Sequence, residues 1–204
     1  MKKILTLFLA LLLAGPGCLW AQKKDAKKET KEAEKQIKPS VPSSLFSSIS
    51  FRSIGPAWAS GRISDFAVNP SDHSEIYAAI SSGNIWKSTN NGTTWKPIFD
   101  RHGSYAIGCI AMDPNNHNAL WVGTGENNHQ RALGWGDGVY YTEDGGASWK
   151  NMGLKESRQI GMIAVDPRNS SVVYVAAEGS AWGPGGERGL YKTTDCGKTW
   201  NKIL

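Results

Sequence analysis

Ser88-Thr89-Asn90-Asn91-Gly92-Thr93-Thr94-Trp95 is the first of three copies of one eight-residue motif in this 204-residue chain. The second copy is Thr142-Glu143-Asp144-Gly145-Gly146-Ala147-Ser148-Trp149, and the third is Thr193-Thr194-Asp195-Cys196-Gly197-Lys198-Thr199-Trp200. A fixed period of roughly 50 residues indicates a repeat architecture, in which each repeat is one supersecondary unit. The motif therefore decides the expected fold class.

Each copy of the motif is typical of a tight turn followed by a strand. An Asn or Asp oxygen at the third position can accept hydrogen bonds from backbone amides about two residues ahead. Glycine at the fifth position permits a positive φ. The closing tryptophan can start the next strand and cover the turn with its apolar ring. We therefore expect a structural role, and not a catalytic one, for Asn90, Gly92, Trp95, Asp144, Gly146, Trp149, Asp195, Gly197 and Trp200.

A second shared block precedes each motif and predicts the strand pattern. It covers residues 63–70, 107–114 and 160–167, where small and apolar residues lead to an Asn-Pro or Asp-Pro turn. Such runs are typical of strands that are buried on both faces. Second strands are expected at 75–79, 119–123 and 172–176, third strands at 84–87, 138–141 and 189–192, and fourth strands from Trp95, Trp149 and Trp200. Four strands per period form one blade of a β-propeller.

The expected fold is therefore all-β: a β-propeller with three four-stranded blades at about residues 60–100, 105–153 and 158–204. Three blades are too few to close a ring, since propellers typically have at least four. We expect residues 49–204 to be the N-terminal part of a larger ring of about seven to ten blades. Assembly of several short chains into one ring is the alternative.

The first 48 residues predict export. Residues 1–21 contain two lysines followed by an apolar run too short to span a bilayer, which is the layout of a signal peptide. Residues 22–48 predict a charged, disordered tether. A lipoprotein signal with acylated Cys18 is the less favoured alternative, because the large aliphatic residue expected three places earlier is missing. We expect a location in the periplasm, at the cell surface or outside the cell, with no transmembrane span in the mature chain.

Charge, histidines and cysteines limit the possible functions. The net charge of +5 lies in the signal and tether, because residues 41–204 contain fourteen basic and fourteen acidic residues. No nucleic-acid partner is therefore expected. The histidines lack metal-ligand spacing, so neither a metal nor another cofactor is predicted. Cys109 is expected in the core and Cys196 as an exposed thiol, without a disulfide between them.

The loops between second and third strands form the face opposite the motifs, because strands alternate in direction. This loop is short in the first blade but long at 124–137 and 177–188, where polar and aromatic residues gather. Long loops on a rigid scaffold are frequent binding sites. The ligand-binding candidates on them are Asn127, Asn128, His129, Arg131, Trp135, Trp182, Glu187 and Arg188.

Three carboxylates in these loops, Glu126, Asp137 and Glu178, are candidate catalytic residues. Two carboxylates at the mouth of a propeller could act as acid and base in glycoside hydrolysis, with Trp135 and Trp182 stacked on sugar rings. The competing interpretation is that the acidic, Asn and Arg side chains pair with one another to hold the long loops.

Several stretches resemble a known family. The stretch Phe51-Arg52-Ser53-Ile54-Gly55-Pro56, the triplet Gly61-Arg62-Ile63 and the runs 135–140 and 182–191 are similar to bacterial sortilin-like proteins with BNR (Asp-box) repeats, often labelled glycosyl hydrolases. The resemblance covers about residues 50–204 and implies a large secreted propeller whose Asp boxes lie away from the ligand site. Sortilins bind peptide or protein ligands. Xyloglucanases share the blade and have a catalytic Asp in the first such loop, where this chain has Ser81-Ser82-Gly83.

The resulting functional hypothesis is an exported propeller that binds a protein, peptide or glycan through the loop face. The alternative is a glycoside hydrolase that acts on a polysaccharide with paired carboxylates. A third hypothesis is a structural assembly factor like the photosystem-type BNR propellers. Sialidase activity is excluded because the required arginine triad and tyrosine nucleophile cannot be assembled from the sequence motif.

Overall fold

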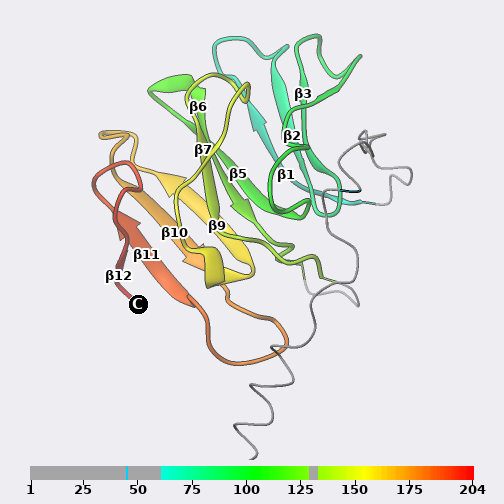
Figure 1. Cartoon of the computed structure of the whole chain (residues 1–204). Helices are drawn as coiled ribbons and strands as arrows, with labels where there is room; N and C mark the ends of the chain where they lie inside the picture. The colour runs from blue at the N-terminus through cyan, green and yellow to red at the C-terminus, as the bar shows by residue number, and fades with distance from the viewer. Residues whose placement is uncertain (1–44, 46–60, 129–132) are drawn as a thin grey trace, which may run out of the picture. The chain divides into compact units, whose positions relative to one another are not determined.

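The computed structural model describes Leu45 and residues 61–128 and 133–204. The predicted signal peptide, and the tether apart from Leu45, lie outside the described residues. Blade 1 is an antiparallel sheet with strand order β1-β2-β3-β4, blade 2 has the order β5-β6-β7-β8, and blade 3 has β9-β10-β11-β12 (Figure 1). The all-β fold with three four-stranded blades is confirmed.

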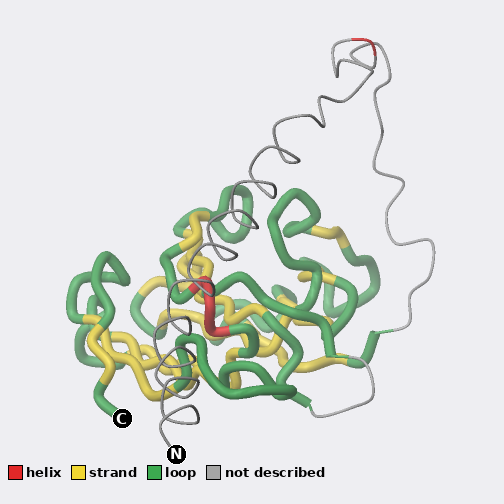
Figure 2. Tube along the Cα trace, turned by 60° about the horizontal axis from the view of Figure 1, so that its bottom comes forward, coloured by secondary structure: helices red, strands yellow, loops and turns green. Residues whose placement is uncertain are grey.

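The strands follow the predicted pattern closely. Their bounds are β1 (Ile63–Val68), β2 (Ile76–Ile80), β3 (Asn84–Ser88), β4 (Lys96–Pro97), β5 (Ile107–Asp113), β6 (Asn116–Thr124), β7 (Val139–Thr142), β8 (Lys150–Asn151), β9 (Ile160–Val165), β10 (Val173–Ala177), β11 (Gly189–Thr193) and β12 (Asn201–Lys202). Within residues 61–128 and 133–204 the one helical segment is the 3-10 turn η2 (Lys155–Ser157). Loops and turns connect the strands (Figure 2).

The fourth strands begin one residue later than predicted. In blade 1, the first cross-strand pair of β4 joins Lys96 to Lys87. Trp95 still belongs to the turn, where its ring lies 3.4 Å from the position that a Cβ on Gly92 would take. The tryptophan therefore covers its own turn, as predicted, but ends it instead of starting the strand.

Hydrogen bonds close each eight-residue turn, which we call the box motif. In the third motif, the Thr199 amide donates to Asp195 Oδ1 at 2.9 Å, and the Gly197 amide donates to Thr193 Oγ1 at 2.9 Å. The amide that donates to the Asp side chain thus lies four residues ahead of it, and not about two as predicted. The longer reach arises because the turn contains two successive residues with positive φ, Cys196 (57°) and Gly197 (77°).

The box carboxylates are fully engaged inside their own turns. Hydrogen bonds from Thr193 and Thr199 lower the pKa of Asp195 to about 2. Hydrogen bonds from Ser148 and Thr142 likewise hold the pKa of Asp144 well below its usual value. This bonding is what a turn-forming role requires.

The two predicted faces are visible in the backbone hydrogen bonds. Each box motif is bonded to its own blade at the turn before the second strand or at the start of that strand: Asn91 N to Ser74 O (3.1 Å), Gly145 N to Asn118 O (2.9 Å) and Cys196 N to Ser171 O (3.1 Å). The loops that follow the second and fourth strands are bonded to each other instead, as at Gly136 N and Arg158 O (2.7 Å). We call this second side the loop face.

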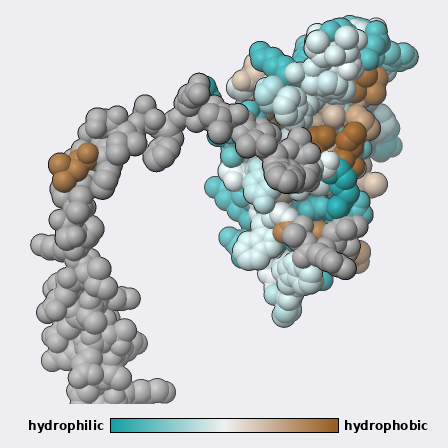
Figure 3. Space-filling view, turned by 90° about the vertical axis from the view of Figure 1, so that its right-hand side faces the viewer, coloured by the Kyte–Doolittle hydropathy of each residue, from teal (hydrophilic) through white to brown (hydrophobic). Residues whose placement is uncertain are grey.

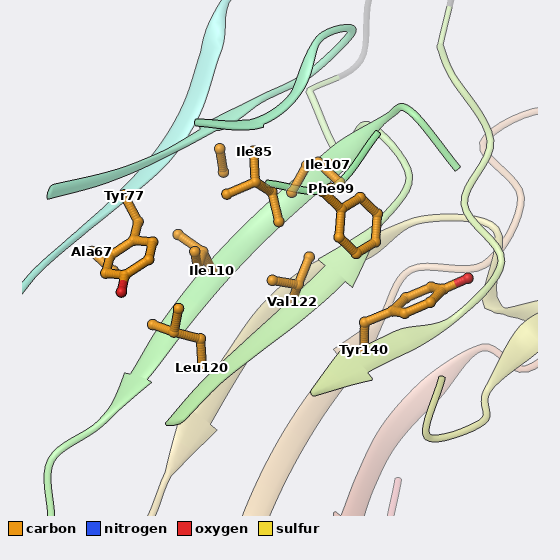
Figure 4. Close-up of a cluster of buried hydrophobic side chains, with 10 residues drawn as sticks. Ala67, Tyr77, Ile85, Phe99, Ile107, Ile110, Leu120, Val122 and Tyr140 are labelled. Atoms are coloured by element: carbon orange, nitrogen blue, oxygen red, sulfur yellow. The ribbon is translucent and has the colours of Figure 1, made fainter. Parts of the chain in front are cut away.

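The core lies between neighbouring blades. Tyr77 and Ile85 of blade 1 pack against Leu120, Val122 and Tyr140 of blade 2 (Figure 4). The opposite face of blade 2 packs on blade 3 through a second apolar cluster: Cys109, Trp121, Val139, Leu154, Ile160, Ile163, Val173, Val175, Ala177 and Tyr191. Blade 2 therefore buries its two faces against different partners, blade 1 and blade 3.

Cys109 and Cys196, the two cysteines within the described residues, are free. Cys109 is buried as predicted, and burial raises the pKa of its thiol to about 12. The expectation for Cys196 is corrected: its side chain is half-buried and not exposed, because the third box motif packs against blade 2, where Trp121 lies 3.0 Å from the position of a Cβ on Gly197.

The box tryptophans join one blade to the one before it. The Trp149 indole N–H donates to the carbonyl of Ile98 in blade 1 at 3.0 Å, and that of Trp200 donates to Met152 O in blade 2 at 2.8 Å. Trp95 has no such acceptor among the described residues. The motif therefore sets the contact between blades as well as the turn.

The outer face of blade 1 is uncovered by the described residues. A groove of about 400 Å³ runs over it, and hydrophobic residues gather on this side of the molecule (Figure 3). The repeat aligns its residues Phe66, Ala78 and Trp86 with Ile110, Val122 and Tyr140, which blade 2 buries against blade 1. The equivalent surface is thus buried against a neighbouring blade in blade 2, whereas in blade 1 no described residue covers it.

Replacement of Trp149 by Phe tests the contact between blades. In the 204-residue chain, Trp149→Phe replaces the indole by a smaller ring and leaves the Ile98 carbonyl without its donor, so we expect the free energy of unfolding to fall by at least about 1 kcal/mol. The matched control, Trp95→Phe, should change it by less than about 0.5 kcal/mol. Urea unfolding measures both, and equal losses would contradict the assignment.

Candidate functional site

Loops from all three blades build the loop face and tie it together. The long loop after β6 bonds to the loop before β5 at Ser104 Oγ and Trp135 O (2.9 Å). It also bonds to blade 3, where Asn127 Nδ2 donates to Gly161 O at 3.0 Å. The loop after β10 is bonded to η2, since Glu187 N donates to Glu156 O at 3.2 Å. The candidate residues therefore sit on a cross-linked surface.

Glu126 is paired and buried. Its side chain is 2% exposed and makes an ion pair with Arg62, and its Oε2 accepts a hydrogen bond from Gly134 N at 3.4 Å. The same Arg62 guanidinium donates to the Asn128 carbonyl at 2.8 Å. The arrangement corresponds to the loop-holding interpretation, with Arg62 anchoring the loop of blade 2 to blade 1.

Asp137 is half-buried and held inside blade 2. It accepts a hydrogen bond from the Tyr140 hydroxyl at 2.7 Å, and its own amide donates to Thr124 Oγ1 at 2.9 Å. Burial and the nearby Asp137 carboxylate raise the pKa of Tyr140. Burial lowers the pKa of His102, although Asp137 opposes this shift. The carboxylate thus has polar partners within its own blade.

Glu178 lies over the first strand of blade 3. Its Oε1 would be 2.5 Å from a Cβ on Gly161, so glycine makes room for this side chain. Asn127 bonds to the carbonyl of the same Gly161. Asn127 and Glu178 therefore both contact Gly161 of blade 3. Glu126 instead pairs with Arg62 of blade 1.

The loop face carries large exposed aromatic rings. Trp135 is 57% exposed and Trp182 is 66% exposed. Tyr105, which the sequence analysis missed, is 59% exposed and comes from the loop before β5. The Arg158 guanidinium covers one side of the Trp135 ring at 4.4 Å from its centroid. Large exposed apolar rings of this kind often mark an interaction surface.

Glu187 and Arg188 hold the loop of blade 3. Glu187 Oε2 accepts from the Glu156 amide at 2.8 Å, and Arg188 Nη2 donates to the Ser180 carbonyl at 2.7 Å. The predicted candidates His129 and Arg131 lie outside the described residues. Arg62 and Arg158 were not predicted; Arg62 stands in a stretch singled out for its family resemblance, but no local pattern marks Arg158.

Two further grooves lie away from the loop face, between the box motifs of neighbouring blades. They measure about 500 and 680 Å³. Their walls include Asp144, whose carboxylate is bonded within its turn, and Lys87, which pairs with Glu75 at 2.6 Å. These two charged side chains therefore serve the fold.

Among residues 61–128 and 133–204, no group of His, Cys, Asp and Glu side chains is placed to hold a metal ion. The same part of the chain contains no helix with the length and apolar character of a membrane span.

Comparison with known proteins identifies the family. Residues 83–204 match the Sortilin-Vps10 family, described as sortilin, neurotensin receptor 3. The chain belongs to the Sortilin-Vps10 family. The predicted resemblance is therefore confirmed over more than half of the sequence.

This Sortilin-Vps10 chain is also similar to curated xyloglucanases. It is 23% identical to xyloglucanase Xgh74A of Acetivibrio thermocellus over 180 residues, which cover 81% of this chain and 20% of the relative. It is 26% identical to the oligoxyloglucan-reducing end-specific xyloglucanase of Emericella nidulans over 155 residues, with 67% and 17% covered. The chain spans about a fifth of the length of the curated relatives that it matches.

Solved structures of similar fold include two GH74 enzymes. The enzyme of Niastella koreensis superposes with a TM-score of 0.53 at 22% identity, covering 68% of this chain and 21% of that one. The GH74 xyloglucanase of Xanthomonas campestris gives 0.52 at 22% identity, covering 70% and 21%. At this identity the likeness establishes the propeller fold of the Sortilin-Vps10 chain and nothing finer.

Truncation of Glu126 tests its role as an anchor. Glu126→Ala removes the buried partner of Arg62, so we expect the free energy of unfolding to fall by about 2–4 kcal/mol. The control Glu156→Ala removes a side chain that is 70% exposed and should cost less than about 0.5 kcal/mol. Chemical denaturation followed by tryptophan fluorescence measures both. An unchanged stability of Glu126→Ala would contradict the anchoring role.

Proposed function

We propose that this chain is part of an exported propeller that binds a glycan through its loop face. The observation that carries the proposal is the exposure of Trp135 and Trp182 on loops that hydrogen bonds hold in place. Preorganised aromatic rings can bind with little loss of conformational freedom. The names of the xyloglucanase relatives favour a glycan over a peptide or protein ligand.

Export rests on the sequence alone. Residues 1–21 have the layout of a signal peptide, and residues 22–48 that of a charged tether before the first blade. A glycan-binding face is useful where polysaccharides are met, which is consistent with a protein in the periplasm, at the cell surface or outside the cell.

Glycoside hydrolysis is the second candidate, favoured by the xyloglucanase relatives. It needs two carboxyl groups that flank the scissile bond. Glu126 is an unsuitable acid or base because Arg62 holds its carboxylate in a buried ion pair. Asp137 and Glu178 are then the carboxylates of this chain to test, with a partner supplied by the same loops or by a further blade.

A binding experiment with the full-length protein separates these functions. Isothermal titration with xyloglucan oligosaccharides should give a Kd that rises at least about tenfold in Trp135→Ala and in Trp182→Ala, since each loses a stacking surface. Arg168→Ala, a change in the exposed turn after β9 and away from the loop face, is the control and should bind as the wild type does.

A turnover assay completes this experiment. Release of reducing ends that is lost in Asp137→Asn or Glu178→Gln would favour the hydrolase. Binding without turnover supports the binding module. An affinity for glycans that neither tryptophan change weakens would overturn the assignment of the loop face.

We also propose that another blade of the same repeat covers the outer face of blade 1 in a longer polypeptide. Ile63 and Phe66 are half-exposed there, although their repeat counterparts Ile107 and Ile110 are buried between blades. A contiguous exposed apolar groove of this kind marks an interaction surface. Repeat equivalence specifies the occupant as a blade whose fourth strand presents a carbonyl to Trp95, as Ile98 does to Trp149.

Trp95→Phe in the longer protein tests the missing blade. With an acceptor in place, this change should lower the free energy of unfolding by about 1 kcal/mol, as expected for Trp149→Phe. It is expected to be neutral in the 204-residue chain, which serves as the control. If Trp95→Phe stays neutral in the longer protein while Trp149→Phe costs stability, no blade of this kind covers the face.

A further inference from the structure

Arg158 sits in a strained turn on the loop face. Its φ and ψ are 63° and −56°, and Ser157 O accepts a hydrogen bond from Gln159 N at 2.6 Å. This is the γ-turn with positive φ, which is rare and strained. Such strain persists only where the surroundings determine the conformation, and it concentrates at functional sites. The strained backbone at Arg158 therefore marks this residue as a candidate functional position.

Buried neighbours hold this turn from both sides. Ser157 and Gln159 are fully buried, and the Gln159 carbonyl accepts the Glu178 amide at 2.9 Å. The Arg158 carbonyl accepts the Gly136 amide at 2.7 Å, which joins it to the loop of Trp135. The backbone is thus fixed while the Arg158 side chain remains 36% exposed.

The guanidinium of Arg158 contacts an aromatic ring but makes only a weak ion pair. It lies 4.4 Å from the centroid of the Trp135 ring. Among residues 61–128 and 133–204 its one acidic partner is Glu156, at 3.7 Å on a side chain that is 70% exposed. That pair is longer than a hydrogen bond and open to solvent, so it is weak. Within the described part of the chain the guanidinium donates no hydrogen bond, so its N–H groups can bind an anion.

The chemistry of this pair specifies its ligand. The Arg158 guanidinium lies over the Trp135 ring, and a guanidinium is a planar fork whose N–H groups match a carboxylate. The exposed part of Trp135 beside it offers an apolar surface for a sugar ring. We infer that Arg158 and Trp135 form a subsite for a uronic acid unit, so that the glycan bound by this face is acidic. This inference rests on the proposed glycan-binding function.

The test compares an acidic probe with its neutral form on the full-length protein. A galacturonic acid trimer should bind at least about tenfold more tightly than its methyl ester, because only the acid offers a carboxylate to the guanidinium. Arg158→Met should bring the two affinities together while binding of the ester persists. Raising the salt concentration should weaken the acid preference of the wild type.

Two further variants keep the result decisive. Arg158→Gly suits a positive φ, so it should fold even if the Met variant does not, and it should also lose the acid preference. Arg168→Met is the control, since Arg168 is 86% exposed in the turn after β9 and pairs with Asp166. It should keep the preference.

The outcomes separate this inference from the proposed function. Equal binding of acid and ester by the wild type, or an acid preference that survives Arg158→Met and Arg158→Gly, overturns the acidic subsite and leaves glycan binding in place. A wild type that binds neither these probes nor xyloglucan oligosaccharides overturns the proposed function itself. Tighter binding of a peptide with a free C-terminal carboxylate than of any sugar would overturn both.

Discussion

The hydrogen bond from a box tryptophan to the preceding blade is the interaction on which the rest of the structure depends. The indole N–H of Trp149 reaches Ile98 O, and that of Trp200 reaches Met152 O. Each ring also closes its own turn or the apolar cluster beside it. Because the turn is pinned by Asp and Thr hydrogen bonds, the tryptophan enters the neighbouring blade at a fixed position. One motif thereby specifies both the hairpin and the spacing of the blades.

Fixed blades leave the opposite face free to vary. The hydrogen bonds inside the box motif are the same in all three blades. On the loop face, by contrast, each pair of neighbouring blades is joined by different contacts. The links between blades 1 and 2 include Arg62 with Glu126, and those between blades 2 and 3 include Gly136 with Arg158 and Asn127 with Gly161. The candidate carboxylate Glu126 takes part in such a link, whereas the rings of Trp135 and Trp182 stay exposed. The division between scaffold and site therefore follows from the direction of the strands.

Much of the fold could be predicted because the same strand and turn pattern occurs three times in the sequence. An apolar run followed by Asn-Pro or Asp-Pro, recurring at 63–70, 107–114 and 160–167, marks the first strand of each blade. The site could be predicted only in outline. The pairing of Arg62 with Glu126 joins residues far apart in the chain, and no local pattern signals it. The γ-turn at Arg158 and the exposure of Tyr105 likewise depend on how loops from different blades meet. The half-buried Cys196 was missed for the same reason, since a neighbouring blade covers it.

Hydrogen exchange of the full-length protein with a bound xyloglucan oligosaccharide tests the central claim most directly. Exchange reports the opening of individual backbone amides, so it locates a ligand without a substitution. The account predicts slower exchange in the loops 125–137 and 178–188, with the box motifs at 88–95, 142–149 and 193–200 unchanged. Protection that appears at the box motifs while both loops stay unchanged would contradict it.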